Sequence, residues 1–184
     1  MRYVFLDRDG VLNRKLPEGA YVIDWARFAW LPGAIEAVAR MNLAGFTLIL
    51  VTNQRGIALG RFTADDLERI HLNLQADLAQ HGARLDAIYF CPHDESQCSC
   101  RKPGIGLFEQ AMRDFPGIQS GNSVVIGDSI SDIEAGRKLG MKTVFIQGEP
   151  EVQKPGASEA AARADAVASS LLEAVELIEK SFFS

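Results

Sequence analysis

Five short runs of mostly apolar, β-branched and aromatic residues constrain the fold of this chain more than any other feature. They occupy residues 3–7, 46–52, 85–90, 123–128 and 142–146. Strands of a parallel sheet are covered on both faces and are therefore apolar almost throughout, which is the pattern of these runs. Amphipathic stretches separate them, at residues 33–45, 63–82, 106–115 and 130–140. The alternation predicts a three-layer α/β/α fold with a doubly wound, Rossmann-like parallel sheet and right-handed crossovers.

The second amphipathic stretch, residues 63–82, carries signals for both of its ends. Thr63 is expected to cap the N-terminus of this helix, and Gly82 is expected to end it. Farther along the chain, residues 147–166 are rich in Gly, Pro, Ala and charge and predict a loop or a weakly helical connector. Residues 170–183 predict a closing helix.

Length and charge limit the possible functions. The chain has 184 residues, a net charge of −5 and no run of Lys or Arg. This length fits one domain, residues 1–184, which can bury its core without disulfides. A nucleic-acid partner is disfavoured because binding the phosphate backbone requires a concentrated positive face. No stretch approaches the roughly 20 apolar residues of a membrane span, and an aspartate follows the start too soon for a signal peptide. We therefore expect a cytoplasmic monomer without membrane association.

Polar residues of a specific kind end three of the predicted strands. Asp7 and Asp9 follow the first run, Thr52 and Asn53 the second, and Asp128 the fourth. In a parallel sheet these strand ends share one edge, which is also where such sheets bind their ligands. A lone aspartate there is commonly a turn former or a helix cap, but grouped carboxylates repel one another unless a cation holds them. The group predicts a divalent ion with oxygen ligands, Mg²⁺.

Four segments carry a family resemblance. They are "FLDRDG" (5–10), "VTNQ" (51–54), "RKPG" (101–104) and "IGDSISD" (126–132). In order and spacing they resemble the four motifs of haloacid dehalogenase (HAD) superfamily phosphatases, and four ordered motifs are far more specific than one. The resemblance implies the HAD fold and phosphatase activity.

The resemblance also implies a role for each matching residue. Asp7 would be the nucleophile that forms an aspartyl phosphate, and Asp9 would be the general acid and then the general base. Thr52 and Lys102 would bind the transferring phosphoryl oxygens. Asp128 would complete the Mg²⁺ site with the Asp7 carboxylate and the Asp9 main-chain carbonyl.

The spacing of the motifs leaves no room for the cap domain that many members of the superfamily carry. The intervals between the first three motifs are used up by the predicted loops, helices and strands. The site is therefore expected to be open. It would take its specificity from residues 13–22, residues 54–62 and the cysteine segment.

All three cysteines and one of the three histidines lie in residues 91–100. The candidate ligands are Cys91, His93, Cys98 and Cys100. Such a Cys₃His set closes a tetrahedral zinc shell and marks a structural site. The alternatives are buried cysteines beside an exposed histidine, a C-x-C redox pair, or a nucleophilic thiol. In a reducing compartment, four potential ligands in one loop favour zinc, which would anchor the chain directly before Arg101 and Lys102.

The zinc loop narrows the resemblance to two groups of capless phosphatases. "CPHDESQCSCRKP" (91–103) resembles the loop of D-glycero-D-manno-heptose 1,7-bisphosphate 7-phosphatases and of histidinol-phosphate phosphatases. "TNQRGIALGRFT" (52–63) and "GAYVIDWARFAWLPGA" (19–34) favour the heptose group. That resemblance implies a small phosphorylated sugar as substrate and a place in ADP- or GDP-heptose synthesis for lipopolysaccharide or another surface polysaccharide. The alternatives are histidinol-phosphate phosphatase activity and, from another class, an inactive zinc-stabilised binding protein.

The same resemblance predicts residues that bind substrate. Asn53 and Gln54 end the second motif and Arg55 follows it, where it would bring a positive charge near the phosphate that is not cleaved. The alternative for Arg55 is a solvated loop arginine. Arg101 has a guanidinium suited to two contacts with a second phosphate or a pair of sugar hydroxyls, with a surface ion pair as the alternative. Lys102 would contact the phosphoryl group itself.

The remaining polar and aromatic residues receive plainer interpretations. Asp132 is either an acid at a helix N-terminus or an outer-shell residue of the metal site. His71 and His81 are interpreted as ordinary helix residues, and Trp25 and Trp30 as packing residues.

Overall fold

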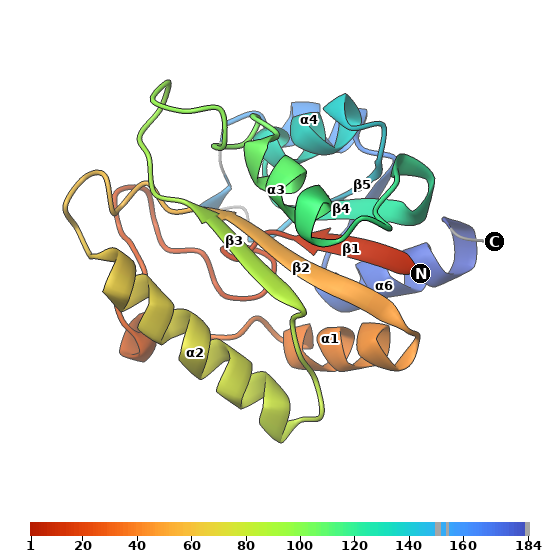
Figure 1. Cartoon of the computed structure of the whole chain (residues 1–184), viewed down its shortest axis with the longest axis horizontal. Helices are drawn as coiled ribbons and strands as arrows, with labels where there is room; N and C mark the ends of the chain where they lie inside the picture. Colours follow the sequence, from red (N-terminus) through yellow and green to blue (C-terminus); the bar gives the residue numbers. More distant parts are fainter. Residues whose placement is uncertain (150–151, 154, 183–184) are drawn as a thin grey trace.

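Six parallel strands form one sheet in the computed structural model, which describes residues 1–149, 152–153 and 155–182 (Figure 1). The strands are β1 (Arg2–Leu6), β2 (Phe46–Asn53), β3 (Ala87–Cys91), β4 (Ser123–Gly127), β5 (Lys142–Ile146) and β6 (Ala166–Ala168). Their order across the sheet is β3-β2-β1-β4-β5-β6, and all neighbours pair in parallel. The winding reverses between β1 and β4, and doubly wound sheets bind their ligands at such a switch point.

Helices cover both faces of the sheet, in agreement with the three-layer prediction. They are α1 (Ala34–Leu43), α2 (Ala64–Gln80), α3 (Gly106–Asp114), α4 (Ile130–Lys138), α5 (Ala157–Arg163) and α6 (Leu171–Ser181), with the 3₁₀ helices η1 (Trp25–Arg27) and η2 (Ser120–Asn122). In Figure 1, α1, α2 and α6 lie below the sheet, and α3 and α4 lie above it.

Strand side chains alternate between two apolar cores. In β1, Val4 and Leu6 face the core shared with α1, α2 and α6, whereas Tyr3 and Phe5 face the core shared with α3 and α4. Phe5 packs against Phe108 of α3 with ring centroids 5.0 Å apart. Full burial of a large apolar side chain contributes about 1.5–3 kcal/mol. This burial on both faces is the reason that the strand sequences are apolar throughout.

The helix α2 begins and ends as its sequence predicts. The Thr63 hydroxyl accepts a hydrogen bond from the main chain of Asp66 at 3.1 Å, and the Asp66 carboxylate accepts one from the main chain of Thr63 at 2.8 Å. Gly82 follows the last residues of the helix with a φ of +66°. A side chain is strained in that conformation, so glycine ends the helix at low cost.

The prediction of a loop or weakly helical connector over residues 147–166 agrees with the short helix α5 but is wrong at its end, where β6 begins. The strand β6 pairs with β5 and extends the sheet. Its sequence, Ala-Val-Ala, is too short to show a strand period, and alanine has little strand propensity. Residues 150–151 and 154 of the predicted connector, and residue 183 of the predicted closing helix, lie outside the described residues.

Loops border the carboxyl edge of the sheet. Between β1 and α1 the described chain forms only the short helix η1, and between β2 and α2 it forms no helix or strand. This arrangement agrees with the prediction that no cap domain covers the site. None of the helices in the described part of the chain is both long and apolar enough to cross a membrane.

Candidate active site

The ammonium group of Lys102 lies between two carboxylates at the carboxyl edge of the sheet. Its Nζ is 2.9 Å from Asp7 Oδ1, just beyond β1, and 2.6 Å from Asp132 Oδ1, in the first turn of α4. It also donates a hydrogen bond to the main-chain oxygen of Val51 at 2.6 Å. Burial alone would lower the pKa of Lys102, but the carboxylates of Asp132 and Asp7 raise it well above its usual range. Lys102 is therefore a fixed positive charge, with only 3% of its side chain exposed.

The main chain around Lys102 is held by neighbouring elements. The Asn53 carboxamide accepts from Lys102 N at 3.0 Å and donates to Lys102 O at 3.1 Å. Lys138 of α4 donates to the main-chain oxygen of Pro103 at 2.8 Å. A Cβ atom at Gly104 would lie 2.2 Å from a main-chain oxygen of the cysteine loop, so the close turn requires glycine. Asn53, which the sequence predicted as a substrate-binding residue, thus has both ends of its amide engaged by Lys102.

Three carboxylates form an acidic cluster beside Lys102. Asp7, Asp128 and Asp132 each offer an oxygen, and these oxygens lie within 4.8 Å of one another. All three residues are buried. Buried carboxylate oxygens at this spacing fit a hard divalent ion such as Mg²⁺. The carboxylate of Asp9 has other partners, so its predicted share in the metal site is its main-chain carbonyl.

Asp132 caps α4 with one oxygen and meets Lys102 with the other. Its Oδ2 accepts from Ser129 N at 3.1 Å and from Ser129 Oγ at 2.5 Å, which completes a capping box. Asp132 therefore both caps the N-terminus of α4 and belongs to the acidic cluster. On the other side of the cluster, Lys15 forms an ion pair with Asp128 and brings a second ammonium group to the cluster.

The carboxylate of Asp9 is held by three side chains. Arg8 Nη2 donates to both of its oxygens at 3.0 Å, Asn13 Nδ2 donates to Oδ1 at 2.9 Å, and Gln54 Nε2 donates to Oδ2 at 3.1 Å. Burial alone would raise the pKa of Asp9, but the charge of Arg8 and these hydrogen bonds hold it below its usual value. Gln54 Nε2 also donates to Thr52 Oγ1 at 2.9 Å. Gln54 thus joins the predicted acid–base residue to a predicted phosphoryl ligand.

The four predicted zinc ligands converge at the end of β3 and on the loop that follows it. Cys100 Sγ lies 3.1 Å from Cys98 Sγ, 3.2 Å from Cys91 Sγ and 3.4 Å from His93 Nδ1. All three cysteines are free of disulfides. Burial alone would raise the pKa of Cys98, but hydrogen bonds from the Cys100 thiol and the Arg101 main chain lower it to about 6. Soft donors around one point, one of which forms a thiolate readily, fit a structural zinc ion.

Two arginines adjoin the cysteine loop. Arg55 forms ion pairs with Asp94 and, at 3.3 Å, with Glu95, so it ties the segment after β2 to that loop. The sequence did not predict this contact. Arg101 has a buried Nη1 atom without a hydrogen-bond partner among the described residues. A hydrogen bond from the Glu95 main chain lowers the pKa of Asp94, and the charges of Arg55 and Arg101 add to this effect, so both arginines lie near that carboxylate.

Comparison with known proteins shows to which family the chain belongs. A family model described as HAD-hydrolase-like matches residues 99–174. The D-glycero-alpha-D-manno-heptose-1,7-bisphosphate 7-phosphatase of Mycobacterium bovis is 44% identical over 132 residues, which cover 71% of this chain and 69% of that protein. The D-glycero-beta-D-manno-heptose-1,7-bisphosphate 7-phosphatase of Escherichia coli O6:H1 is 35% identical over 187 residues, which cover 96% of this chain and 94% of that protein. The chain belongs to the HAD-like phosphatases.

Solved structures agree with this membership. The D,D-heptose 1,7-bisphosphate phosphatase from B. bronchiseptica, complexed with magnesium and phosphate, has a TM-score of 0.85 and 31% identity, and the match covers 98% of this chain and 99% of that chain. The corresponding enzyme from Burkholderia thailandensis has a TM-score of 0.70 and 26% identity, covering 98% of this chain and 100% of that chain. The HAD resemblance predicted from the four motifs is confirmed.

Sequence reasoning gave no individual role to four side chains that contact the site of this HAD-like phosphatase, although it predicted residues 13–22, which include two of them, as a specificity segment. The four are Arg8, Asn13, Lys15 and His71. Arg8 and Asn13 are buried, with 1% and 0% of their surface exposed. Their place in the sequence, next to apolar residues, could have indicated that these polar side chains are buried at the site. Lys15 and His71 gave no such signal, because a loop lysine and a helix histidine are ordinarily peripheral.

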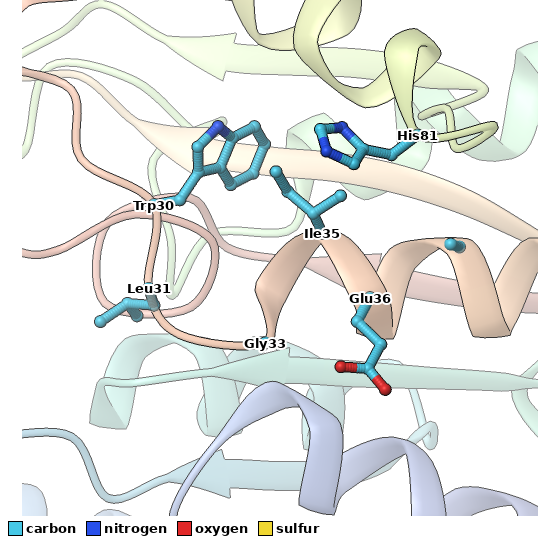
Figure 2. Close-up of a pocket in the computed structure, with 7 residues that line it drawn as sticks. Trp30, Leu31, Gly33, Ile35, Glu36 and His81 are labelled. Atoms are coloured by element: carbon cyan, nitrogen blue, oxygen red, sulfur yellow. The ribbon is translucent and has the colours of Figure 1, made fainter.

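A separate pocket of about 430 Å³ lies beside the start of α1 (Figure 2). It is lined by Trp30, Leu31, Gly33, Ile35, Glu36, Ala39 and His81. Figure 2 shows Ile35 between Trp30 and His81. Trp30 Nε1 donates to Asp77 Oδ2 at 2.8 Å, as expected of a packing residue whose polar end finds a partner. The pocket shares no residue with the acidic cluster or with the four residues of the cysteine group.

Proposed function

We propose that this protein hydrolyses the 7-phosphate of D-glycero-D-manno-heptose 1,7-bisphosphate, with Mg²⁺ and through an aspartyl-phosphate intermediate. The observation that carries the proposal is the position of Asp7 against the ammonium group of Lys102, with Asp9 held separately by Arg8. One carboxylate thus faces a fixed cation, where a phosphoryl group can be neutralised, and the second is available for proton transfer. The names of the relatives support the sugar substrate, and none of those named above favours histidinol phosphate.

In the first step, a carboxylate oxygen of Asp7 attacks the phosphorus atom of the 7-phosphate. The new bond makes an aspartyl phosphate, and the bond between phosphorus and the sugar oxygen breaks. Asp9 donates a proton to that oxygen, which leaves as a hydroxyl group. Lys102 and Thr52 bind the phosphoryl oxygens while the group is transferred.

In the second step, water attacks the phosphorus atom of the aspartyl phosphate. Asp9, now deprotonated, accepts a proton from the water, and the bond to Asp7 breaks to release inorganic phosphate. The lowered pKa of Asp9 suits this step. The first step requires the protonated form, and the approach of a doubly negative phosphate favours that form because a nearby negative charge raises the pKa of a carboxyl group.

The proposed Mg²⁺ ligands are the carboxylates of Asp7 and Asp128 and the main-chain carbonyl of Asp9. A divalent ion bound there would offset negative charge on the phosphoryl group. Lys15 contacts the Asp128 carboxylate, so it contributes to the charge balance of the same site.

The proposed zinc ligands are Cys91, His93, Cys98 and Cys100, which would close a structural site. Arg101 and Lys102 come directly after the last of these ligands. A metal that fixes this end of the loop therefore limits the positions available to both side chains.

Arg101 is proposed to bind the phosphate that is not cleaved, because its buried Nη1 atom has no partner among the described residues. Asn53 and Gln54 would act at the substrate site through Lys102 and Asp9, which their side chains hold. Arg55 would lie at the rim of the site, beside the cysteine loop. We further propose that the protein acts as a single-domain monomer in the cytoplasm. There, its product would keep the anomeric phosphate needed for activation to a nucleotide-linked heptose.

Phosphate release from four substrates tests the proposal. They are the α and β anomers of heptose 1,7-bisphosphate, histidinol phosphate and fructose 1,6-bisphosphate, each assayed with Mg²⁺. We expect kcat/KM for one heptose anomer to be about 100-fold higher than kcat/KM for histidinol phosphate or fructose 1,6-bisphosphate. Buried polar groups discriminate strongly against a substrate that leaves them unpaired. Preferred turnover of histidinol phosphate would replace the proposal with that alternative. The absence of phosphate release from all four would favour a binding protein.

A further inference from the structure

His71 is a buried titratable residue for which the proposed phosphatase chemistry has no use. It lies on α2, next to the core residue Ile70, and is 7% exposed. Its ring meets that of Phe90 edge to face, with centroids 6.3 Å apart. Burial and the charge of Arg8 lower the pKa of His71 to about 3. The imidazole is therefore neutral at physiological pH.

The partner of His71 is Arg8, which stands between Asp7 and Asp9 in the sequence. Arg8 Nη1 is 3.5 Å from His71 Nε2, although the two residues are 63 positions apart in the chain. Arginine has only donors, so Nε2 of the neutral ring is the acceptor and the proton of His71 is on Nδ1.

Each nitrogen atom of the Arg8 guanidinium has an acceptor within 3.5 Å. Its Nη2 donates to both oxygens of Asp9 at 3.0 Å and to Gln54 Oε1 at 3.3 Å, and its Nε donates to Asp9 Oδ1 at 3.3 Å. Two neutral acceptors from different elements, Gln54 after β2 and His71 on α2, thus fix the plane of the group that grips Asp9. A guanidinium is planar and rigid, so its orientation sets the orientation of the carboxylate it binds.

We propose that His71 is a positioning residue for Asp9, which acts by accepting a hydrogen bond from Arg8. The inference rests on the proposed role of Asp9 as the acid that protonates the leaving sugar oxygen. Proton transfer requires a heavy-atom distance of roughly 2.6–3.2 Å, so a small rotation of Arg8 would spoil it. The helix α2, which carries none of the four HAD motifs, would in this way take part in the reaction.

Three variants separate positioning from stability. His71→Leu removes the acceptor and keeps an apolar side chain in the core. His71→Gln keeps an acceptor near the position of Nε2. Leu74→Ala, one helical turn farther along α2, removes a fully buried side chain from the core that also contains Ile70, and it is the control for loss of packing.

The variants are compared on two kinds of phosphate ester with Mg²⁺. An alkyl phosphate, here heptose 1,7-bisphosphate or fructose 1,6-bisphosphate, has a poor leaving group that needs a proton, whereas p-nitrophenyl phosphate releases a stable phenolate. The comparison uses kcat/KM, because this ratio reports only the steps up to departure of the leaving group. We expect His71→Leu to lower kcat/KM about tenfold for the alkyl phosphate and less than about twofold for the aryl phosphate, a fraction of the 10²–10⁴ that acid–base catalysis provides. His71→Gln should restore the alkyl activity, and Leu74→Ala should leave the ratio of the two activities unchanged.

Equal losses on both esters in His71→Leu, or the same change of ratio in Leu74→Ala, would overturn the proposal. If the wild type hydrolyses fructose 1,6-bisphosphate and not the heptose compound, the proposed substrate fails while the test of His71 stands. Nitrogen-15 NMR of the wild type at neutral pH gives a readout that is independent of turnover. A proton on Nδ1 of His71 is expected, and a proton on Nε2 would contradict the hydrogen bond from Arg8.

Discussion

Lys102 depends on neighbouring side chains both for its charge and for its place. Burying an ammonium group is costly unless partners compensate, and here Asp7 and Asp132 provide that compensation. Asn53 holds the main chain of Lys102 and so sets the direction in which the lysine side chain extends. Its amide binds Lys102 N and Lys102 O, so a residue of the second HAD motif fixes the position of Lys102 in the third.

Replacement of Asn53 tests this arrangement. Asn53→Ala removes two hydrogen bonds, each of which contributes about 1 kcal/mol. We expect kcat/KM to fall by about tenfold, because a catalytic charge that is misplaced by 1 Å loses much of its effect. The control is Asn73→Ala, which removes a side-chain bond of 2.9 Å to Arg69 on the exposed face of α2. Unchanged phosphate release in Asn53→Ala would show that Lys102 is held by other contacts.

The loop between β3 and α3 is an element without a helix or strand of its own. Its residues have to be fixed by side chains or by a metal, because they lack a ladder of main-chain hydrogen bonds. The four candidate zinc ligands run from Cys91, at the end of β3, to Cys100. Between the second and third of them, Asp94 and Glu95 form ion pairs with Arg55, which fasten the loop to the segment after β2. The loop thus connects the second motif to the third.

Loss of one zinc ligand should therefore disturb both metal binding and catalysis. In Cys98→Ala we expect metal analysis to find no bound zinc and kcat/KM to fall by at least about tenfold, since Arg101 and Lys102 lose their anchor. Ser99→Ala changes the neighbouring residue, which is not a ligand, and should keep one zinc per chain and normal turnover. Wild-type protein purified without zinc but with full activity would contradict the proposed site.

At the scale of the molecule, a neutral histidine within the core makes stability depend on pH. The pKa of His71 is about 3 in the folded protein, against an ordinary value of about 6.5 in the unfolded chain. Below pH 6.5 the unfolded chain therefore binds a proton that the folded protein does not. Stability rises with pH wherever the unfolded state binds more protons, so His71 lowers stability as the solution becomes acidic.

The size of this effect can be measured with His71→Gln. Between pH 7 and pH 5 the free energy of unfolding of the wild type should fall by about 2 kcal/mol more than that of the variant, since each unit of pH below 6.5 contributes about 1.4 kcal/mol. Urea unfolding at the two pH values gives both changes. Parallel losses in the two proteins would mean that His71 is protonated in the folded state.

Some of this architecture could be predicted from the sequence for a definite physical reason. Strands of a parallel sheet end at one edge, so Asp7, Thr52 and Asp128 had to meet there once the strands were recognised. The convergence of Cys91, His93, Cys98 and Cys100 was predictable because these residues are close in sequence. β6 was not, because three residues carry too little pattern.

The contact between Arg8 and His71 was beyond reach for a different reason. The residues lie 63 positions apart, and their meeting depends on how α2 crosses the sheet. A histidine beside the apolar positions of a helix looks like a packing residue, and only the packed structure shows which group it faces. The ion pairs of Arg55 with the cysteine loop were also beyond reach, because they depend on the conformations of two loops. From the sequence, Arg55 was predicted only to lie near the substrate.

Phosphorus-31 NMR of the products is the most direct test of the central claim, that Asp7 takes the phosphoryl group from position 7 of the sugar. Wild-type protein with Mg²⁺ and heptose 1,7-bisphosphate should yield inorganic phosphate and heptose 1-phosphate. Asp7→Asn should yield neither, because an amide cannot serve as the nucleophile. Heptose 7-phosphate as the product, or normal turnover by Asp7→Asn, would contradict the account.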